Sequence, residues 1–138
     1  MIRPAGDEDA EALARLAGEL GYPSTADEMR ARLAQLSSDN AVLVMEEGGG
    51  VVAWIHVAVV FSLESGSYTQ IAGLVVTESR RGIGIGASLV RAAEEWARSR
   101  GTARLRVRTN ITRTATHVFY ERCGFDHTKT SRLYEKRL

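Results

Sequence analysis

The chain has 138 residues, of which 44% are hydrophobic, and its formal net charge is +1 at neutral pH. This length fits one domain with a sizeable core, so we expect a single domain over residues 1–138. The balanced charge argues against a nucleic acid as the main partner. No apolar run approaches the ~18–20 residues of a membrane span, and the single cysteine suits a reducing cytoplasm, where we expect the protein to act.

Hydrophobic periodicity and turn-forming residues predict the elements. In chain order we expect a strand near residues 1–4, helices near 8–20 and 25–36, strands at 41–45 and 51–61, a loop at 62–67, a strand at 68–76, a helix at about 83–100, a strand at 103–108, a helix at 112–122 and final strands near 125–128 and 131–137. This pattern predicts an α/β (α+β) fold, with a mixed central sheet of about six to seven strands flanked by about four helices.

A glycine-rich segment, Arg80-Arg81-Gly82-Ile83-Gly84-Ile85-Gly86, separates the apolar strand at 68–76 from the next helix. Alternate glycines let backbone N–H groups converge on one site, and a helix N-terminus carries unpaired donors and partial positive charge. With two arginines beside it, the segment suits a pyrophosphate. It lacks the lysine of a P-loop. It also lacks the acidic residue that a dinucleotide fingerprint needs about twenty positions later, where residues 103–108 are basic.

A second block, residues 110–125, reads Asn-Ile-Thr-Arg-Thr-Ala-Thr-His-Val-Phe-Tyr-Glu-Arg-Cys-Gly-Phe. Ala115, Val118 and Phe119 share one face of a predicted helix, which Thr112 can cap. Gly124 suits the left-handed position that ends such a helix.

The two blocks resemble the GNAT N-acetyltransferase superfamily. Arg81-Gly82-Ile83-Gly84-Ile85-Gly86 matches its acyl-CoA-binding motif, Arg/Gln-x-x-Gly-x-Gly/Ala, and residues 119–125 match its closing Phe-Tyr-Glu-x-x-Gly-Phe signature. The turn Leu20-Gly21-Tyr22-Pro23 is similar to that of small bacterial-type members, which include aminoglycoside acetyltransferases. The resemblance implies acetyl-CoA as cosubstrate, no metal, and direct transfer of the acetyl group to an amine.

The same resemblance implies which residues hold acetyl-CoA. The pantetheine arm is expected along the strand backbone at Leu74, Val75 and Val76, whose amides would also polarise the thioester carbonyl. The rest of the cofactor is expected at Arg80, Arg81, Gly82, Ile83, Gly84, Ile85, Gly86, Ala87, Asn110 and Tyr120.

Tyr120 is also expected to be the general acid, because a phenol can give a proton to the departing thiolate. The general base is left open by the sequence. The glutamate that many family members carry falls here on Gln70 or Ala72, of which Gln70 could still position a water. The alternatives are Glu64, His56, His117 and a water chain.

The acceptor pocket is expected at Tyr22, Trp54 and His56. Cys123 is interpreted as a packed side chain and not as an acyl carrier. The alternating Arg104, Arg106 and Arg108 are interpreted as a polar sheet face or a subunit contact, with a site for an anionic acceptor as the alternative.

The predicted function is an N-acetyltransferase acting on a primary amine of a small molecule, of aminoglycoside, polyamine or amino-acid type. One alternative is a protein lysine or N-terminal acetyltransferase. Another is a non-catalytic acyl-CoA-binding sensor, which the missing strand glutamate favours. The expected partners are the amine and a second copy of the chain in a homodimer, with no nucleic acid and no membrane.

Overall fold

A computed structural model describes residues 1–138 of the chain. The chain divides into two compact units, residues 1–107 and residues 108–138, and each is described by itself.

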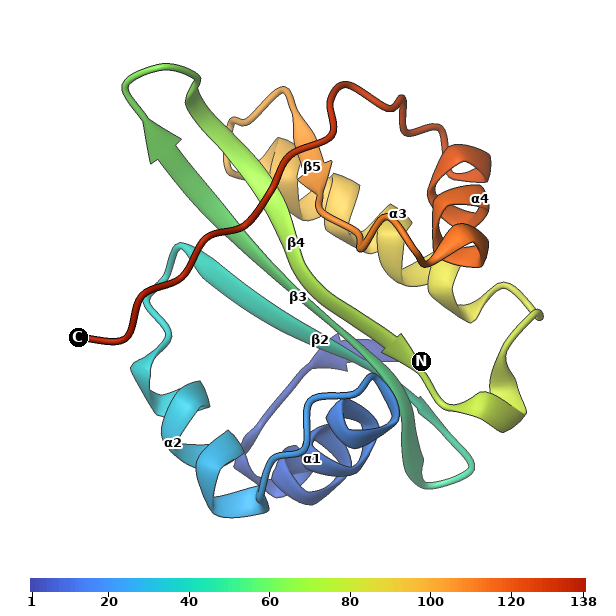
Figure 1. The fold of residues 1–138 in the computed structure, drawn as a ribbon. Coiled ribbons are helices and arrows are strands. Elements are labelled where there is room, and N and C mark those ends of the chain that lie inside the picture. The colour runs from blue at the N-terminus through green and yellow to red at the C-terminus, as the bar shows by residue number, and fades with distance from the viewer. The chain divides into compact units, whose positions relative to one another are not determined.

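The first unit is built on a five-stranded sheet in the order β1-β2-β3-β4-β5 (Figure 1). The strands are β1 (Ile2–Pro4), β2 (Asn40–Glu47), β3 (Gly50–Ser62), β4 (Gly66–Val76) and β5 (Leu105–Val107). The first four strands pair antiparallel in sequence, whereas β5 runs parallel to β4, so the sheet is mixed. The predicted α/β class is therefore confirmed.

The strand count is lower than the six to seven expected, because residues 125–128 and 131–137 form no strand. The apolar side chains of this last segment, Leu133, Tyr134 and Leu138, are exposed. Without a buried apolar face, nothing fixes the register of a strand there or offsets the entropy of ordering it.

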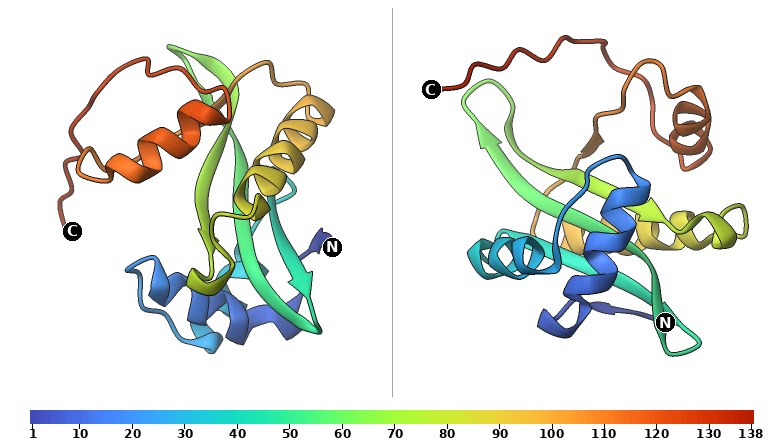
Figure 2. Two further views of the ribbon diagram at one scale, coloured as in Figure 1. Left: turned by 90° about the vertical axis from the view of Figure 1, so that its right-hand side faces the viewer. Right: turned by 60° about the horizontal axis from the view of Figure 1, so that its bottom comes forward.

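The helices of the first unit cover both faces of the sheet (Figures 1 and 2). They are the short 3-10 turns η1 (Asp7–Asp9) and η2 (Glu78–Arg80), and the helices α1 (Ala10–Glu19), α2 (Ala26–Gln35) and α3 (Ile85–Ser99). α1 and α2 lie on one face and α3 on the other. No helix of the structure combines the length and the apolar character needed to cross a bilayer.

Strand alternation decides which side chains meet which helix. Val44 of β2 and Val75 of β4 flank Trp54 of β3 across the ladder, and both valines form a buried cluster with Leu13 and Leu16 of α1. The alternate residues of β3, Ala53, Ile55 and Val57, are fully buried and belong to the opposite face. That face of the sheet is covered by α3 (Figure 1). Even-numbered positions of β3 around Trp54 therefore face α1 and α2.

An ion pair ties β1 to the start of α1. The Arg3 guanidinium donates from both terminal nitrogens to the two carboxylate oxygens of Asp9 at 2.9 Å, and the Gly6 amide donates to Asp9 Oδ2 at 2.8 Å. The Asp9 side chain is only 5% exposed. These charge-assisted bonds stabilise the carboxylate form of a nearly buried acid.

We expect Asp9→Asn to lower the free energy of unfolding by about 2 kcal/mol at neutral pH, since it weakens hydrogen bonds to a charged group. The Arg3 guanidinium holds the pKa of Asp9 below its usual range. Asp9 therefore stabilises the fold above its unfolded pKa of about 3.9, and this contribution fades as pH falls through the lower folded value. Urea denaturation across acidic and neutral pH should show the difference in free energy of unfolding between the parent and Asp9→Asn shrinking below about pH 4.

The control is Asp7→Asn, at an exposed position nearby. A difference between the parent and Asp9→Asn that does not change with pH would contradict the assignment.

Candidate functional site

β4 contains a bulge at Ala72. His56 of β3 pairs with Gly73, whereas Val57 pairs with Ile71, so that Ala72 is an extra residue in the ladder. The parallel ladder with β5 includes only Thr69, Gln70 and Ile71, all before the bulge. The β5-facing edge of β4 is therefore without a strand partner from Gly73 onward.

The backbone groups on this open edge belong to alternate residues, Leu74 and Val76, because successive residues direct their N–H and C=O to opposite edges. The next backbone amide, that of Thr77, donates towards β3, to the Val52 carbonyl at 2.8 Å. The Val76 carbonyl accepts a hydrogen bond from Arg81 Nε at 2.8 Å instead of from a strand. An extended ligand backbone could thus pair with β4 here, where Leu74, Val75 and Val76 were expected to hold one.

The glycine-rich segment leads directly into α3. Gly82 and Gly84 have φ of +80° and +94°, the left-handed region that a side chain disfavours, and Gly84 is the N-cap of α3. The first helical bond runs from the Ser88 amide to the Gly84 carbonyl at 3.0 Å. The amides of Ile85, Gly86 and Ala87 precede it, and Gly84 has no side chain to cap them. These donors, at the positive end of a helix, form a cradle for an anion such as a pyrophosphate.

The two arginines beside the cradle take part in ion pairs. Arg80 Nη2 lies 2.6 Å from Glu47 Oε1, and Arg81 Nη2 lies 3.6 Å from Glu19 Oε1. The Glu19 carboxylate also accepts from Thr77 Oγ1 at 2.8 Å and from the Glu78 amide at 2.9 Å. Glu19, at the end of α1, therefore fixes the segment that enters the glycine loop. Its pKa is lowered, first by the Thr77 hydroxyl and then by the Glu78 amide and the nearby arginines.

The second unit is organised by α4 (Thr114–Arg122). Its end has the two crossed hydrogen bonds of a Schellman motif, from the Gly124 amide to the Glu121 carbonyl and from the Phe125 amide to the Tyr120 carbonyl. Gly124 has φ +94°, which confirms the left-handed position predicted for it. The rings of Tyr120 and Phe125 pack edge to face, 5.4 Å apart, and supply the apolar contact of the motif.

Tyr120 is the buried residue of α4, and burial is the main cause that raises its pKa to about 12, with a smaller contribution from Cys123. The phenol is therefore protonated at every pH at which the protein is expected to work. Cys123 itself is half-buried at the end of the helix.

Asn110 organises the turn before α4. Its Oδ1 accepts from the amide and the hydroxyl of Thr112, and its carbonyl lies 2.8 Å from His117 Nε2. The prediction that Thr112 caps the helix is wrong. The N-cap is Arg113, without a side-chain cap bond, because the Thr112 hydroxyl is occupied by Asn110.

The residues predicted for the acceptor pocket differ in exposure. Trp54 and His56 point to the same face of β3, while Tyr22 is exposed in the turn between α1 and α2. The Trp54 ring lies against Gly73, where an added Cβ would sit 2.9 Å from the ring, and its Nε1 donates to the Leu13 carbonyl at 3.3 Å. Gln70 is half-buried on the same face, just before the bulge.

The basic residues of the β5 region are held by aromatic and backbone contacts. The Arg106 guanidinium lies 4.1 Å from the ring centre of Tyr68, and Arg104 lies near the same ring and donates to the Ser65 carbonyl. Arg108 belongs to the second unit, where it bonds Ser131. Glu64 is exposed at the β3–β4 turn.

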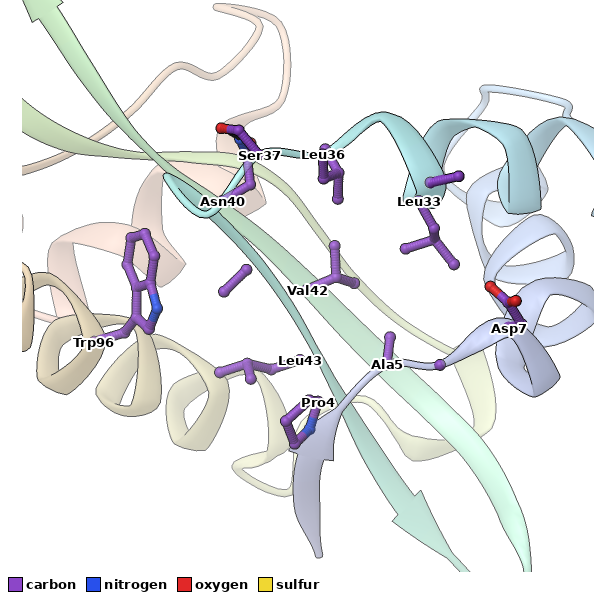
Figure 3. Close-up of a pocket in the computed structure, with 13 residues that line it drawn as sticks. Pro4, Ala5, Asp7, Leu33, Leu36, Ser37, Asn40, Val42, Leu43 and Trp96 are labelled. Atoms are coloured by element: carbon purple, nitrogen blue, oxygen red, sulfur yellow. Dashed lines mark hydrogen bonds between the residues drawn. The ribbon is translucent and has the colours of Figure 1, made fainter.

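Two hollows in the first unit lie away from these residues. One, of about 450 Å³, is lined by the first residues of β2, by Leu33 of α2 with Leu36 just after that helix, and by Trp96 of α3 (Figure 3). The other, of about 680 Å³, surrounds Arg3 and Asp9. Neither contains a residue expected to bind the cofactor or the acceptor. No group of three or more metal-ligating side chains is brought together in residues 1–138.

Three features of the site were not predicted from the sequence. Glu19 contacts Thr77 and Glu78, and Asn40 Oδ1 lies 2.9 Å from His56 Nε2. These partners are far apart along the chain, and no spacing rule points to them. The bulge at Ala72 depends on how β3 and β5 pair with β4. Only the small residues Ala72 and Gly73 within an apolar strand could have signalled an irregularity.

The chain is similar to known acetyltransferases in sequence and in fold. A sequence profile of the acetyltransferase (GNAT) family matches residues 10–125. Aminoglycoside N(6')-acetyltransferase type 1 of Klebsiella aerogenes is 27% identical over 147 aligned positions, which cover 100% of this chain and 97% of that protein. A putative acetyltransferase of Agrobacterium tumefaciens has a similar structure, with a TM-score of 0.87 and 30% identity over 99% of both chains. The CoA complex of aminoglycoside N-acetyltransferase AAC(6')-Iy shares the fold, with a TM-score of 0.85 at 20% identity over 100% of both chains.

Proposed function

We propose that this chain acetylates a primary amine of an aminoglycoside-like small molecule. The chain belongs to the acetyltransferase (GNAT) family and is an acetyl-CoA-dependent N-acetyltransferase. The observation that carries the acceptor class is the likeness to the Klebsiella aerogenes aminoglycoside N(6')-acetyltransferase, which extends over the whole chain. The homodimer and the cytoplasmic location expected from the sequence stay predictions.

The open edge of β4 and the glycine loop fit acetyl-CoA. The backbone of Leu74 and Val76 would pair with the pantetheine arm, and the amides of Gly82 to Ala87 would bind the pyrophosphate. Left-handed glycines at the loop support this assignment, because they keep side chains away from the approaching phosphates. Arg80 and Arg81 would add long-range attraction while their ion pairs fix the loop.

The bound thioester supplies the acetyl group, and the chain's own groups position it and move protons. Amides of β4 on the open edge would polarise the thioester carbonyl. Tyr120 would donate a hydrogen bond to the departing sulfur. Its pKa of about 12 makes it a weaker acid than a free phenol, so we expect stabilisation of the leaving thiolate and not complete transfer ahead of bond cleavage.

An acceptor panel tests the proposal. The protein is incubated with acetyl-CoA and, separately, an aminoglycoside with a primary 6'-amine, a polyamine, an amino acid and a lysine-containing peptide, and thiol release is followed. We expect the aminoglycoside to give the highest kcat/KM. Preference for the peptide would point to a protein acetyltransferase, and tight acetyl-CoA binding without any transfer would point to a sensor. Either result would contradict the proposal.

Tyr120→Phe keeps the ring packing and removes the hydroxyl. If Tyr120 assists the departing thiolate, kcat should fall about 10²-fold. Acetyl-CoA affinity should change much less, because the lost interaction matters mainly in the transition state. Steady-state kinetics with the best acceptor of the panel, together with calorimetric titration of acetyl-CoA, measure both effects. Full activity in the variant would leave Tyr120 a packing residue.

A further inference from the structure

We infer that His56 is the general base of the transfer reaction, and that its Nδ1 takes the proton of the acceptor amine directly or through one water. This inference rests on the proposed function and assigns a base that the sequence left open.

His56 lies beside the place where the acetyl group is proposed to bind. It is the cross-strand partner of Gly73, the first residue after the bulge in β4. Opposite residues of antiparallel strands have Cα atoms about 4.5–5.5 Å apart. Gly73 begins the stretch of β4 whose outer edge is open, so an amine that reaches the thioester there also comes within reach of the His56 ring.

The surroundings of His56 contain no competing carboxylate. On the same face, β4 presents Gly73 and Gln70, and β2 presents Val42 and Asn40, none of which ionises. From α1 and α2, the side chains packed against the buried cluster around Trp54, on the same face, include Leu13, Met29 and Leu33, which are apolar. No charged group contributes to the pKa shift of His56. The acid nearest to Asn40 in sequence, Asp39, lies 2.7 Å from Arg100 and is paired with it. His56 is thus the group on this part of the face that can take up a proton near neutral pH.

Asn40 fixes the tautomer of His56. Asn40 Oδ1 lies 2.9 Å from His56 Nε2, while Asn40 Nδ2 donates to Ser37 Oγ at 3.3 Å. Figure 3 shows Asn40 and Ser37 together at the start of β2. The bond to Ser37 orients the amide with its oxygen towards the imidazole, so Nε2 must donate and carries the ring proton. Nδ1 then keeps its lone pair, and it makes no hydrogen bond within the protein.

Partial burial also changes the pKa of the His56 imidazole. Desolvation lowers the pKa of His56 below its ordinary value of 6.5, so the ring is neutral at neutral pH and ready to accept a proton. Burial is the sole cause of this shift, which agrees with the absence of charged neighbours.

The proton balance of the step is simple. One N–H bond of the acceptor ammonium breaks, and its proton goes to His56 Nδ1. The freed lone pair forms the new C–N bond to the acetyl carbonyl carbon, and the C–S bond breaks with its electron pair on sulfur, where the proposed Tyr120 donor stabilises the thiolate. The nitrogen then loses its second proton, which passes to the thiolate or to water and leaves a neutral amide, and the imidazolium returns the first proton to solvent.

Kinetics with a 6'-amino aminoglycoside test the assignment. His56→Gln should lower kcat/KM about 10²-fold and remove the low-pH limb of its profile, with unchanged acetyl-CoA affinity. Asn40→Asp places a carboxylate against Nε2, so the pKa of His56 should rise and the low-pH limb should move upward by about one unit or more. A histidine that only packs would not transmit that shift. His127→Gln, at an exposed position, is the matched control.

A second measurement does not need an acceptor. Nitrogen-15 NMR of the histidine rings should show His56 as the Nε2–H tautomer with a pKa below 6.5, and Asn40→Asp should raise that pKa. An Nδ1–H tautomer would overturn the assignment of the base. So would an active enzyme whose pH profile is the same in the parent, in His56→Gln and in Asn40→Asp. An inactive wild type with the predicted tautomer would instead count against the proposed acceptor.

Discussion

The site depends on one irregularity, the bulge at Ala72, which separates a paired part of β4 from an open part. Before the bulge, β4 is hydrogen-bonded on both edges, to β3 and to β5. After it, only the β3 side is paired, and the strand offers backbone donors and acceptors on the other. A sheet normally hides such an edge because it invites another chain to pair. Here the edge lies directly before a glycine loop and a helix N-terminus, so one extended ligand with an anionic end can satisfy both.

The remaining contacts hold this arrangement in place. Glu19 links the end of α1 to the segment after β4 by accepting hydrogen bonds from Thr77 and Glu78. Arg81, in the glycine loop, donates a hydrogen bond to the Val76 carbonyl of β4. Trp54 covers Gly73 from the face of α1 and α2, where a larger residue at position 73 would displace the ring. The same face carries His56, held by Asn40. The open edge of β4, where the cofactor is proposed to bind, and the proposed base therefore meet at a single residue pair, His56 and Gly73.

Local chemistry was predictable from the sequence, and long-range pairing was not. Gly124 has the left-handed backbone expected of it, since few other residues can end a helix in that way. The four strands from β1 to β4 and the four α-helices were also predicted from hydrophobic periodicity. By contrast, the prediction that Thr112 caps α4 is wrong, because the Thr112 hydroxyl donates to Asn110 Oδ1 instead. Residues 125–128 and 131–137 were expected to form strands and do not. Whether such a segment pairs depends on a partner strand that the sequence does not specify. The bond between Asn40 and His56 joins two strands, and no local pattern encodes it.

Calorimetric titration of coenzyme A into matched glycine variants tests the central claim most directly. Gly84 and Gly49 have φ of +94° and +81°, and both have open space where a side chain would be added. Valine at either position imposes a similar backbone strain, but only Gly84 lies in the proposed pyrophosphate cradle. The account predicts that folded Gly84→Val binds coenzyme A at least about tenfold more weakly, or ~1.4 kcal/mol, while Gly49→Val binds like the parent. Equal affinity in both folded variants would show that the glycine loop is only a turn.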